Sequence, residues 1–177
     1  QTCALPILMV PRIEPHKPYG CIILNKQDAH FNKYDVDGEN NMEDRFARII
    51  EKTETIISQA RLSNNLDKIV YIIGSDEFNS EWTNSTTKGT PQTNIASYQE
   101  SFKMICEHEI RMVTTLLLSC RELEVVYVPG NHDEYAGWHL ISWLSTFFRN
   151  NERVKFDDSP KYRKYISYGS SAMMLNH

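Results

Sequence analysis

Short apolar runs and longer amphipathic stretches alternate along the chain. Three of the apolar runs are typical of buried strands: CIILN at 21–25, KIVYIIG at 68–74 and EVVYVPG at 124–130. The stretches after them carry apolar residues at spacings of three and four, which indicates helices with one apolar face. The predicted faces are Met42, Phe46, Ile49, Ile50, Ile56, Ile57 and Ala60; then Phe102, Ile105, Cys106, Met112, Val113, Leu116 and Leu117; then Trp138, Ile141, Leu144, Phe147 and Phe148.

The order of these elements predicts an α/β fold. Strand–helix alternation implies right-handed crossovers and a parallel sheet. The final RKYISYGSSAMMLNH indicates a β-hairpin with a Gly-Ser turn. Ser97 and Glu100 match a capping box at the start of the second helix. The polar stretch before it, NSEWTNSTTKGTPQTN, has no periodicity, and loops of that length are often functional.

Length and the two ends of the chain set the expected domain organisation. The 177 residues suffice for one domain with a core. We divide them into an irregular, Pro-rich lead-in at 1–20 and a domain at 21–177. QTCALPI at 1–7 looks like a reading-frame translation of a sequencing adapter and is left out of the fold prediction. The chain stops in AMMLNH, in a predicted strand and its exit, so we expect the domain to be truncated there.

The composition of the chain limits the cellular compartment and the classes of binding partner that we expect. The net charge of −4 argues against a broadly basic nucleic-acid surface, although a local strip such as Lys161, Arg163 and Lys164 is compatible with it. No apolar run approaches the roughly 20 residues of a membrane span. The four cysteines are widely spaced, which favours a reduced, cytoplasmic setting over a disulfide framework. The sequence leaves the oligomeric state open.

Polar side chains that can bind metals follow each predicted strand. The carboxyl ends of parallel strands meet at one edge of the sheet, so we expect these groups to converge. Carboxylate, imidazole and amide together suit Mn²⁺, Fe²⁺ or Zn²⁺. A two-metal site also needs a bridging carboxylate, and Asp76 follows the middle strand. The candidates are Asp28 and His30; Asp76, Glu77 and Asn79; Asn131, His132, Asp133 and Glu134; and Asn176 and His177.

Each motif also has a plainer structural interpretation. The segments DAH and GSDE, taken alone, fit ordinary caps or turns. In VPGNHDE, Pro-Gly-Asn suffices for a turn and leaves His132 and Asp133 unexplained. His16, His108 and His139 are interpreted as surface or packing residues, with His108 in a solvated position. DVDGENN at 35–41 lacks the ligand spacing and closing Glu of a calcium loop, which favours a polar turn.

Together, DAH, GSDE, VPGNHDE and the final NH resemble the calcineurin-like metallophosphoesterases. The nearest group is the phage and bacterial phosphoesterases similar to DNA-repair exonucleases of the SbcD type. The resemblance implies a sandwich of two mixed β-sheets flanked by helices (α/β/β/α), incomplete at the C-terminus. It also implies two divalent ions, with Mn²⁺ favoured over Fe²⁺ or Zn²⁺. By the same resemblance, Asp28 and His30 bind the first ion, Asp76 bridges, and Asn131 and His177 bind the second.

The resemblance also assigns the catalytic groups. His132 is the non-ligand histidine that contacts phosphate and protonates the leaving oxygen, and Asp133 orients either the loop or that imidazole. Two departures stand out: Ser75 separates Gly74 from Asp76, and the family's Gly-His-x-His motif is absent and is expected beyond His177. The chain as given is therefore expected to bind metal poorly and to lack full activity, with Glu77 a less favoured substitute for the bridge.

The implied function is metal-dependent hydrolysis of a phosphoester, with DNA as the expected substrate of a phosphodiesterase or exonuclease. Trp82 and Lys88, in the long polar loop, are candidates to stack a base and contact phosphate. The alternative for that loop is a variable surface insertion. Two alternatives for the protein are a small-molecule or nucleotide phosphatase or phosphodiesterase of the same fold, and a non-catalytic binding or scaffold domain.

Overall fold

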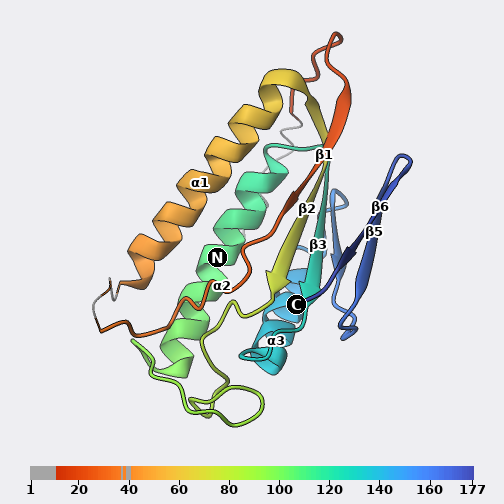
Figure 1. Ribbon diagram of the computed structural model, residues 1–177. Coiled ribbons are helices and arrows are strands. Elements are labelled where there is room, and N and C mark those ends of the chain that lie inside the picture. The colour runs from red at the N-terminus through yellow and green to blue at the C-terminus, as the bar shows by residue number, and fades with distance from the viewer. Residues whose placement is uncertain (1–10, 37, 39–40) are drawn as a thin grey trace.

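The computed structural model describes residues 11–36, 38 and 41–177 (Figure 1). The adapter-like residues 1–7 and part of the predicted turn at 35–41 lie outside these ranges. The helices are α1 (Met42–Ser63), α2 (Tyr98–Leu117) and α3 (Glu134–Phe147). The strands are β1 (Tyr19–Leu24), β2 (Asn65–Gly74), β3 (Glu122–Val128), β4 (Val154–Asp157), β5 (Lys164–Tyr168) and β6 (Ser171–Leu175). Every strand and helix predicted from the sequence is present.

The larger sheet has the strand order β1-β2-β3-β4, and all of its pairs are parallel. The predicted position of β2 between β1 and β3 is confirmed. The fourth strand, β4, was not predicted. Its sequence VKFD offers only two apolar residues, which is too short a pattern to separate a strand from a loop. It pairs with β3 from Leu123↔Val154 to Val126↔Asp157.

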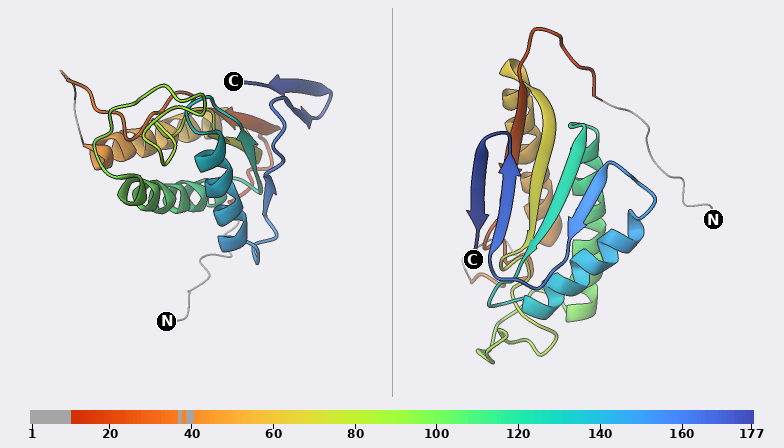
Figure 2. Two further views of the ribbon diagram at one scale, coloured as in Figure 1. Left: turned by 90° about the horizontal axis from the view of Figure 1, so that it is seen from below. Right: turned by 90° about the vertical axis from the view of Figure 1, so that its right-hand side faces the viewer.

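Side chains of β2 alternate between two buried faces of this sheet, which explains its unbroken apolar run. Ile69, Tyr71 and Ile73 pack in the cluster formed with the helices. Val70 and Ile72 pack in a second cluster with residues of the β5-β6 hairpin. Figure 2 shows the resulting layers, with the helices on one side of the parallel sheet and the hairpin on the other.

The second sheet differs from the predicted sandwich. Among the described residues it consists of β5 and β6 alone, and their pairing is antiparallel. Neither sheet is therefore mixed, because helices connect the strands of the first and a tight turn connects those of the second. Within the same residues no helix covers the outer side of the hairpin, where Tyr165 and Met174 are exposed. The layers described are helices, parallel sheet and hairpin.

The helix boundaries follow the capping residues. Asn41 accepts hydrogen bonds from the backbone N–H groups of Glu43 and Asp44, and the predicted capping box of Ser97 and Glu100 is present. The predicted apolar faces were too wide at their margins, where Ile56, Trp138 and Phe147 are exposed. None of the helices in the described part of the chain has both the length and the apolar character that crossing a membrane requires.

Candidate metal centre

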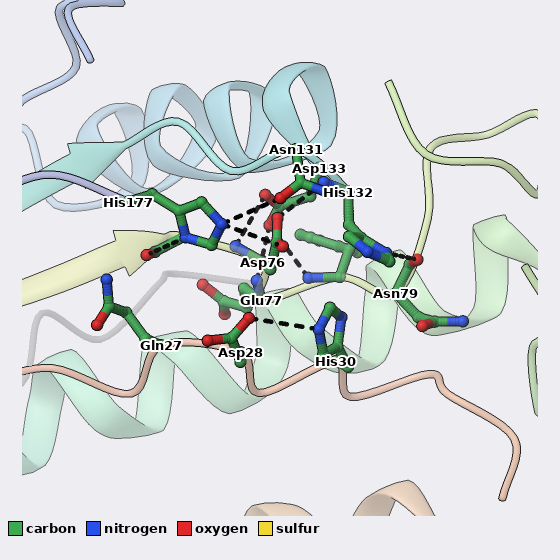
Figure 3. A network of polar contacts seen from close by, with 12 residues as sticks. Gln27, Asp28, His30, Asp76, Glu77, Asn79, Asn131, His132, Asp133 and His177 are labelled. Carbon is green, nitrogen blue, oxygen red and sulfur yellow. Dashed lines mark hydrogen bonds and ion pairs between the residues drawn. The ribbon is translucent and has the colours of Figure 1, made fainter. Parts of the chain in front are cut away.

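The predicted ligands converge at one end of the molecule (Figure 3). Asp28 and His30 follow β1, Asp76 follows β2, Asn131 follows β3, and His177 follows β6. β6 belongs to the hairpin, yet its end reaches the carboxyl edge of the parallel sheet, where the C-terminus lies beside the end of β2 (Figure 1). Both sheets therefore contribute to one site.

Asp76 occupies the centre of this site. It belongs to two groups of potential metal ligands, one with His30 and His132 and the other with Asp28 and His177. In each group the ligand atoms lie within 4.8 Å of one another. The Asp76 side chain is buried, with 2% of the residue exposed. A carboxylate that belongs to two ligand groups has the position that a bridging ligand needs.

The donor atoms suit divalent ions that bind nitrogen and oxygen together. Burial lowers the pKa of His30, and the nearby His132 lowers it further, against the opposing effect of Asp76 and Asp28. The neutral imidazole, which is the form that binds metal, is thereby favoured near neutral pH. His30 Nδ1 is buried without a hydrogen-bond partner among the described residues, while Nε2 lies 3.6 Å from Asp28 Oδ1. The residues present fit a pair of divalent ions.

His177 is held by three side chains. Its Nε2 atom lies 3.1 Å from Asn131 Oδ1 and 3.3 Å from Asp76 Oδ2. Its Nδ1 atom lies 2.9 Å from the hydroxyl oxygen of Ser75. Ser75, the residue between Gly74 and Asp76, thus has a place in the site. The structure brings together all five predicted ligands: Asp28, His30, Asp76, Asn131 and His177 (Figure 3).

Unusual backbone conformations present these ligands. Asp28, His30, Ser75 and Asp76 have positive φ angles between 41° and 64°. This region costs a residue other than glycine about 1 kcal/mol or more, and such strain is concentrated at functional sites in proteins. Backbone hydrogen bonds hold the two loops in register: Asp28 N donates to Ser75 O and His30 N to Asp76 O, both at 3.0 Å.

Gly130 explains how the loop after β3 approaches Asp76. A Cβ atom at this position would lie 2.1 Å from Asp76 Oδ1 and 2.4 Å from its backbone nitrogen. Only glycine fits at this position, because any side chain would clash with Asp76. It allows the backbone N–H of His132 to donate to Asp76 Oδ1 at 2.7 Å. The first residue of GNHDE thus permits the contact that orients the central carboxylate.

The His132 ring has a defined tautomer. Its Nδ1 atom lies 2.8 Å from the carbonyl oxygen of Asn79, which can only accept, so Nδ1 carries a proton. Nε2 is left for metal or substrate. The His132 and His30 rings meet edge to face, with centroids 4.5 Å apart. His132 also belongs to the ligand group of His30 and Asp76, so its position allows it to act as a metal ligand, a role that the resemblance does not give it.

Asp133 holds the loop that carries Asp76. Its carboxylate accepts hydrogen bonds from the backbone N–H groups of Asp76 at 3.1 Å, Glu77 at 2.8 Å and Phe78 at 3.1 Å. Burial raises its pKa to about 7, against the effect of these N–H donors. Of the two roles expected for Asp133, these contacts favour orientation of the loop.

Glu77 faces away from the ligands, into a buried ionic cluster. Lys26 Nζ lies 2.7 Å from Glu77 Oε1 and 2.8 Å from Glu109 Oε1, and the Tyr71 hydroxyl donates to Glu109 Oε2 at 2.8 Å. Burial raises the pKa of Glu77 to about 8. Burial acts in the same direction on Glu109, but Lys26, His108 and the Tyr71 hydroxyl together outweigh it and lower the pKa of Glu109. With Lys26 as the ammonium, Glu109 as the carboxylate and Glu77 as the protonated acid, the cluster has no net charge. It connects the loops that follow β1 and β2 to α2.

The long loop between β2 and α2 touches the site through its backbone. Thr87 N donates to the carbonyl oxygen of Asn131 at 3.0 Å. Glu81 is buried and accepts hydrogen bonds from Tyr135 N and Ala136 N. It therefore caps the N-terminus of α3, although it is remote from that helix in the sequence. Trp82, 72% exposed, and Lys88, also exposed, lie outside both ligand groups. The sequence carried no signal for the cap by Glu81.

His108 is buried, which corrects the predicted solvated position. It is 3% exposed, and its ring stacks on Phe46 with centroids 4.4 Å apart. Burial lowers its pKa to about 4. The spacing from Ile105 through His108 to Met112 matches the apolar stripe of α2, so periodicity offered a signal for burial that the charged neighbours obscured.

Replacing His108 by leucine is expected to remove an acid-sensitive part of the stability. The pKa of His108 is about 4 in the folded chain, against an ordinary value of 6.5. The unfolded chain therefore takes up the proton first, and stability falls as the pH drops from 6.5 towards 4, by up to about 3 kcal/mol. Urea unfolding of wild type and His108→Leu across this range measures the difference. The control is His139→Leu, which replaces an exposed histidine. A difference in the free energy of unfolding between wild type and His108→Leu that stays constant across this pH range would contradict the prediction.

Comparison of the chain with protein-family models, with curated proteins and with solved structures found no match.

Proposed function

We propose that this protein is a metal-dependent phosphoester hydrolase of the calcineurin-like metallophosphoesterase type. The observation that carries the proposal is the place of Asp76 in two ligand groups that share no other residue. A single-metal site needs one such group. Strand-end ligands on either side of a central carboxylate are the arrangement expected of a two-metal hydrolase.

The ligand assignment is the one that the resemblance implies. It pairs Asp28 with His30, whereas the two groups place His30 with His132 and Asp28 with His177. Asp28 and His30, whose Oδ1 and Nε2 atoms lie 3.6 Å apart, would hold one ion. Asn131 and His177, joined by a contact of 3.1 Å, would hold the other, with Asp76 shared. The mixture of imidazole, carboxylate and amide donors suits Mn²⁺, Fe²⁺ or Zn²⁺, and the resemblance favours Mn²⁺ among them. Ser75 departs from the family pattern, yet its hydroxyl contacts His177.

Bound divalent ions lower the pKa of water and offset negative charge on phosphoryl oxygens. The protein's own part is to place a proton donor beside the leaving oxygen. His132 fits this role, because Asn79 O fixes the proton on Nδ1 and leaves Nε2 to the site. With Nε2 protonated, His132 donates that proton to the leaving oxygen as the bond to phosphorus breaks. Asp133 keeps the loop of Asp76 in place through three backbone N–H groups.

The proposed substrate is a phosphodiester, with DNA as the main candidate. Exposed Trp82 and Lys88 remain candidates to contact a nucleic-acid strand from the loop beside Asn131. A phosphatase or phosphodiesterase for small molecules would use the same metal centre. The scaffold alternative requires lost ligands, and the clustering of the ligand set speaks against it.

Manganese-dependent hydrolysis of bis-p-nitrophenyl phosphate tests the proposal. The protein is used with any natural sequence that follows His177, where the resemblance would place a Gly-His-x-His motif. We expect turnover with Mn²⁺ that is abolished by EDTA and restored by added Mn²⁺, together with binding of two ions by elemental analysis. Two bound ions without turnover would indicate that the enzyme accepts a narrower range of substrates. Failure to bind any ion would refute the metal centre and favour the scaffold alternative.

A further inference from the structure

A groove leads away from Asp28 and His30 along α1. Its first part is a cavity of about 340 Å³ between the loop that carries these residues and the start of α1. A second cavity of about 300 Å³ shares Ile49 and Lys52 with the first and is lined mainly by apolar residues of β1 and α1. The two cavities are therefore neighbours along α1, the first beside Asp28 and His30 and the second beside β1.

Basic side chains line the first of these cavities. Arg45, Arg48 and Lys52 recur at spacings of three and four, which places them along one stripe of α1, and Lys33 completes the wall of the first cavity. The acidic residues Asp28 and Asp35 line the same cavity. Another cavity beside α1 is lined by glutamates at 43, 51 and 54 instead. The charges of α1 are thus segregated, in a chain whose net charge is −4.

Arg45 and Lys52, at the two ends of the basic stripe on α1, differ in role. Arg45 Nη1 donates to the carbonyl oxygens of Phe31 at 3.2 Å and Lys33 at 2.9 Å, so this guanidinium fixes the wall of the groove. Lys52 is exposed and lies seven residues further on, about 10 Å along the helix axis. One strand of nucleic acid carries a charge about every 3.4 Å of axis. The stripe is therefore long enough to accompany more than one phosphate.

We propose that this basic groove binds a further phosphate group of a nucleotide chain whose scissile phosphate lies at the metal centre. The inference rests on the proposed hydrolase function. Lys52 and Arg48 contact the second phosphate, and Lys33 adds positive charge beside the metal centre. The apolar cavity beyond Lys52, with Ile23, Ile49 and Ile56 in its walls, accepts a base. That cavity favours a nucleotide chain over inorganic polyphosphate, which carries charge alone.

A pair of dinucleotides tests the inference in the Mn²⁺-loaded protein. Thymidylyl-thymidine is compared with the same compound carrying a terminal phosphate, at the 5′ or the 3′ end. We expect wild type to prefer one phosphorylated form by roughly tenfold in kcat/KM. Lys52→Glu should reduce this preference by roughly fivefold. The matched control is Lys103→Glu, which reverses an exposed lysine on α2 and should keep the preference.

A binding measurement separates the two proposals. Fluorescein-labelled thymidine tetranucleotide is titrated with protein in EDTA at low salt, where no hydrolysis occurs. Weaker binding by Lys52→Glu than by Lys103→Glu, by roughly fivefold, would support the groove even if the protein hydrolysed neither dinucleotide. Hydrolysis without any preference, together with equal binding by both variants, would overturn the groove and leave the hydrolase proposal intact. Inorganic triphosphate that competes as well as unlabelled strand would overturn the assignment to a nucleotide chain.

Discussion

His132→Ala is expected to lower kcat by roughly 10²–10⁴-fold while the protein keeps the two proposed metal ions, because the proposed assignment makes His132 the general acid and not a ligand. The backbone N–H of residue 132 still donates to Asp76 Oδ1, so the central carboxylate keeps its orientation. The loss should grow with the basicity of the leaving group. It should be smallest for p-nitrophenyl esters, whose leaving oxygen needs little protonation, and largest for alkyl esters such as dinucleotides.

The leaving-group series distinguishes the two roles that the position of His132 allows. A histidine that acted as a metal ligand would lose bound metal on substitution and slow all esters by a similar factor. Elemental analysis therefore tests whether His132 binds metal, and the slope of log kcat against leaving-group pKa tests whether His132 acts as the general acid. The control is His139→Ala, which removes an exposed imidazole from α3. Unchanged turnover of alkyl esters by His132→Ala would refute the assignment.

Asp76→Asn is expected to abolish activity by removing metal, since the substituted residue belongs to both ligand groups. The amide keeps the size of the carboxylate and still accepts the hydrogen bond from His132 N. It also removes a buried negative charge that faces Asp133, whose pKa is raised by burial and by Asp76. Without metal, we expect the variant to be as stable as wild type or more stable by about 1 kcal/mol.

Elemental analysis and urea unfolding in EDTA check these two expectations together. Asp158→Asn makes the same chemical change at an exposed aspartate and should leave metal content and stability unchanged. Two ions bound to Asp76→Asn would refute the bridging role. A marked loss of stability would indicate that Asp76 is a structural residue, because removal of like-charge repulsion should stabilise the metal-free protein.

The sequence predicted most of the fold because its strongest signals are periodic. β2 is buried on both faces, so its apolar run is unbroken, and the stripes of α1 and α2 extend over several turns. β4 escaped prediction because two apolar residues carry no periodicity. The pairing of β5 with β6 was predictable from the turn. Their packing against Val70 and Val126 depends on contacts between distant segments, which local patterns do not encode.

The candidate ligands were predictable because each lies in the segment that follows a strand, and topology brings the ends of these strands together. The interactions that support them were not. Glu81 caps α3 across 54 residues, and Lys26 joins Glu77 and Glu109 below the site. Nothing local distinguishes these side chains from surface charges. The left-handed conformations of Asp28 and Ser75 are equally hidden, because neither is a glycine.

The place of His177 at the end of β6 has a consequence for the order in which the protein can mature. The chain emerges during synthesis from its N-terminal end, so β1, β2 and β3 can pair before the hairpin exists. Docking of β6 depends on Val70, Ile72, Val126 and Val128, which line the face of the finished parallel sheet. A nascent chain therefore holds Asp28 and Asp76 in place before His177 arrives. Affinity for the proposed second ion would then mark the docking of β6, and a ribosome-bound chain should acquire the two proposed sites one after the other.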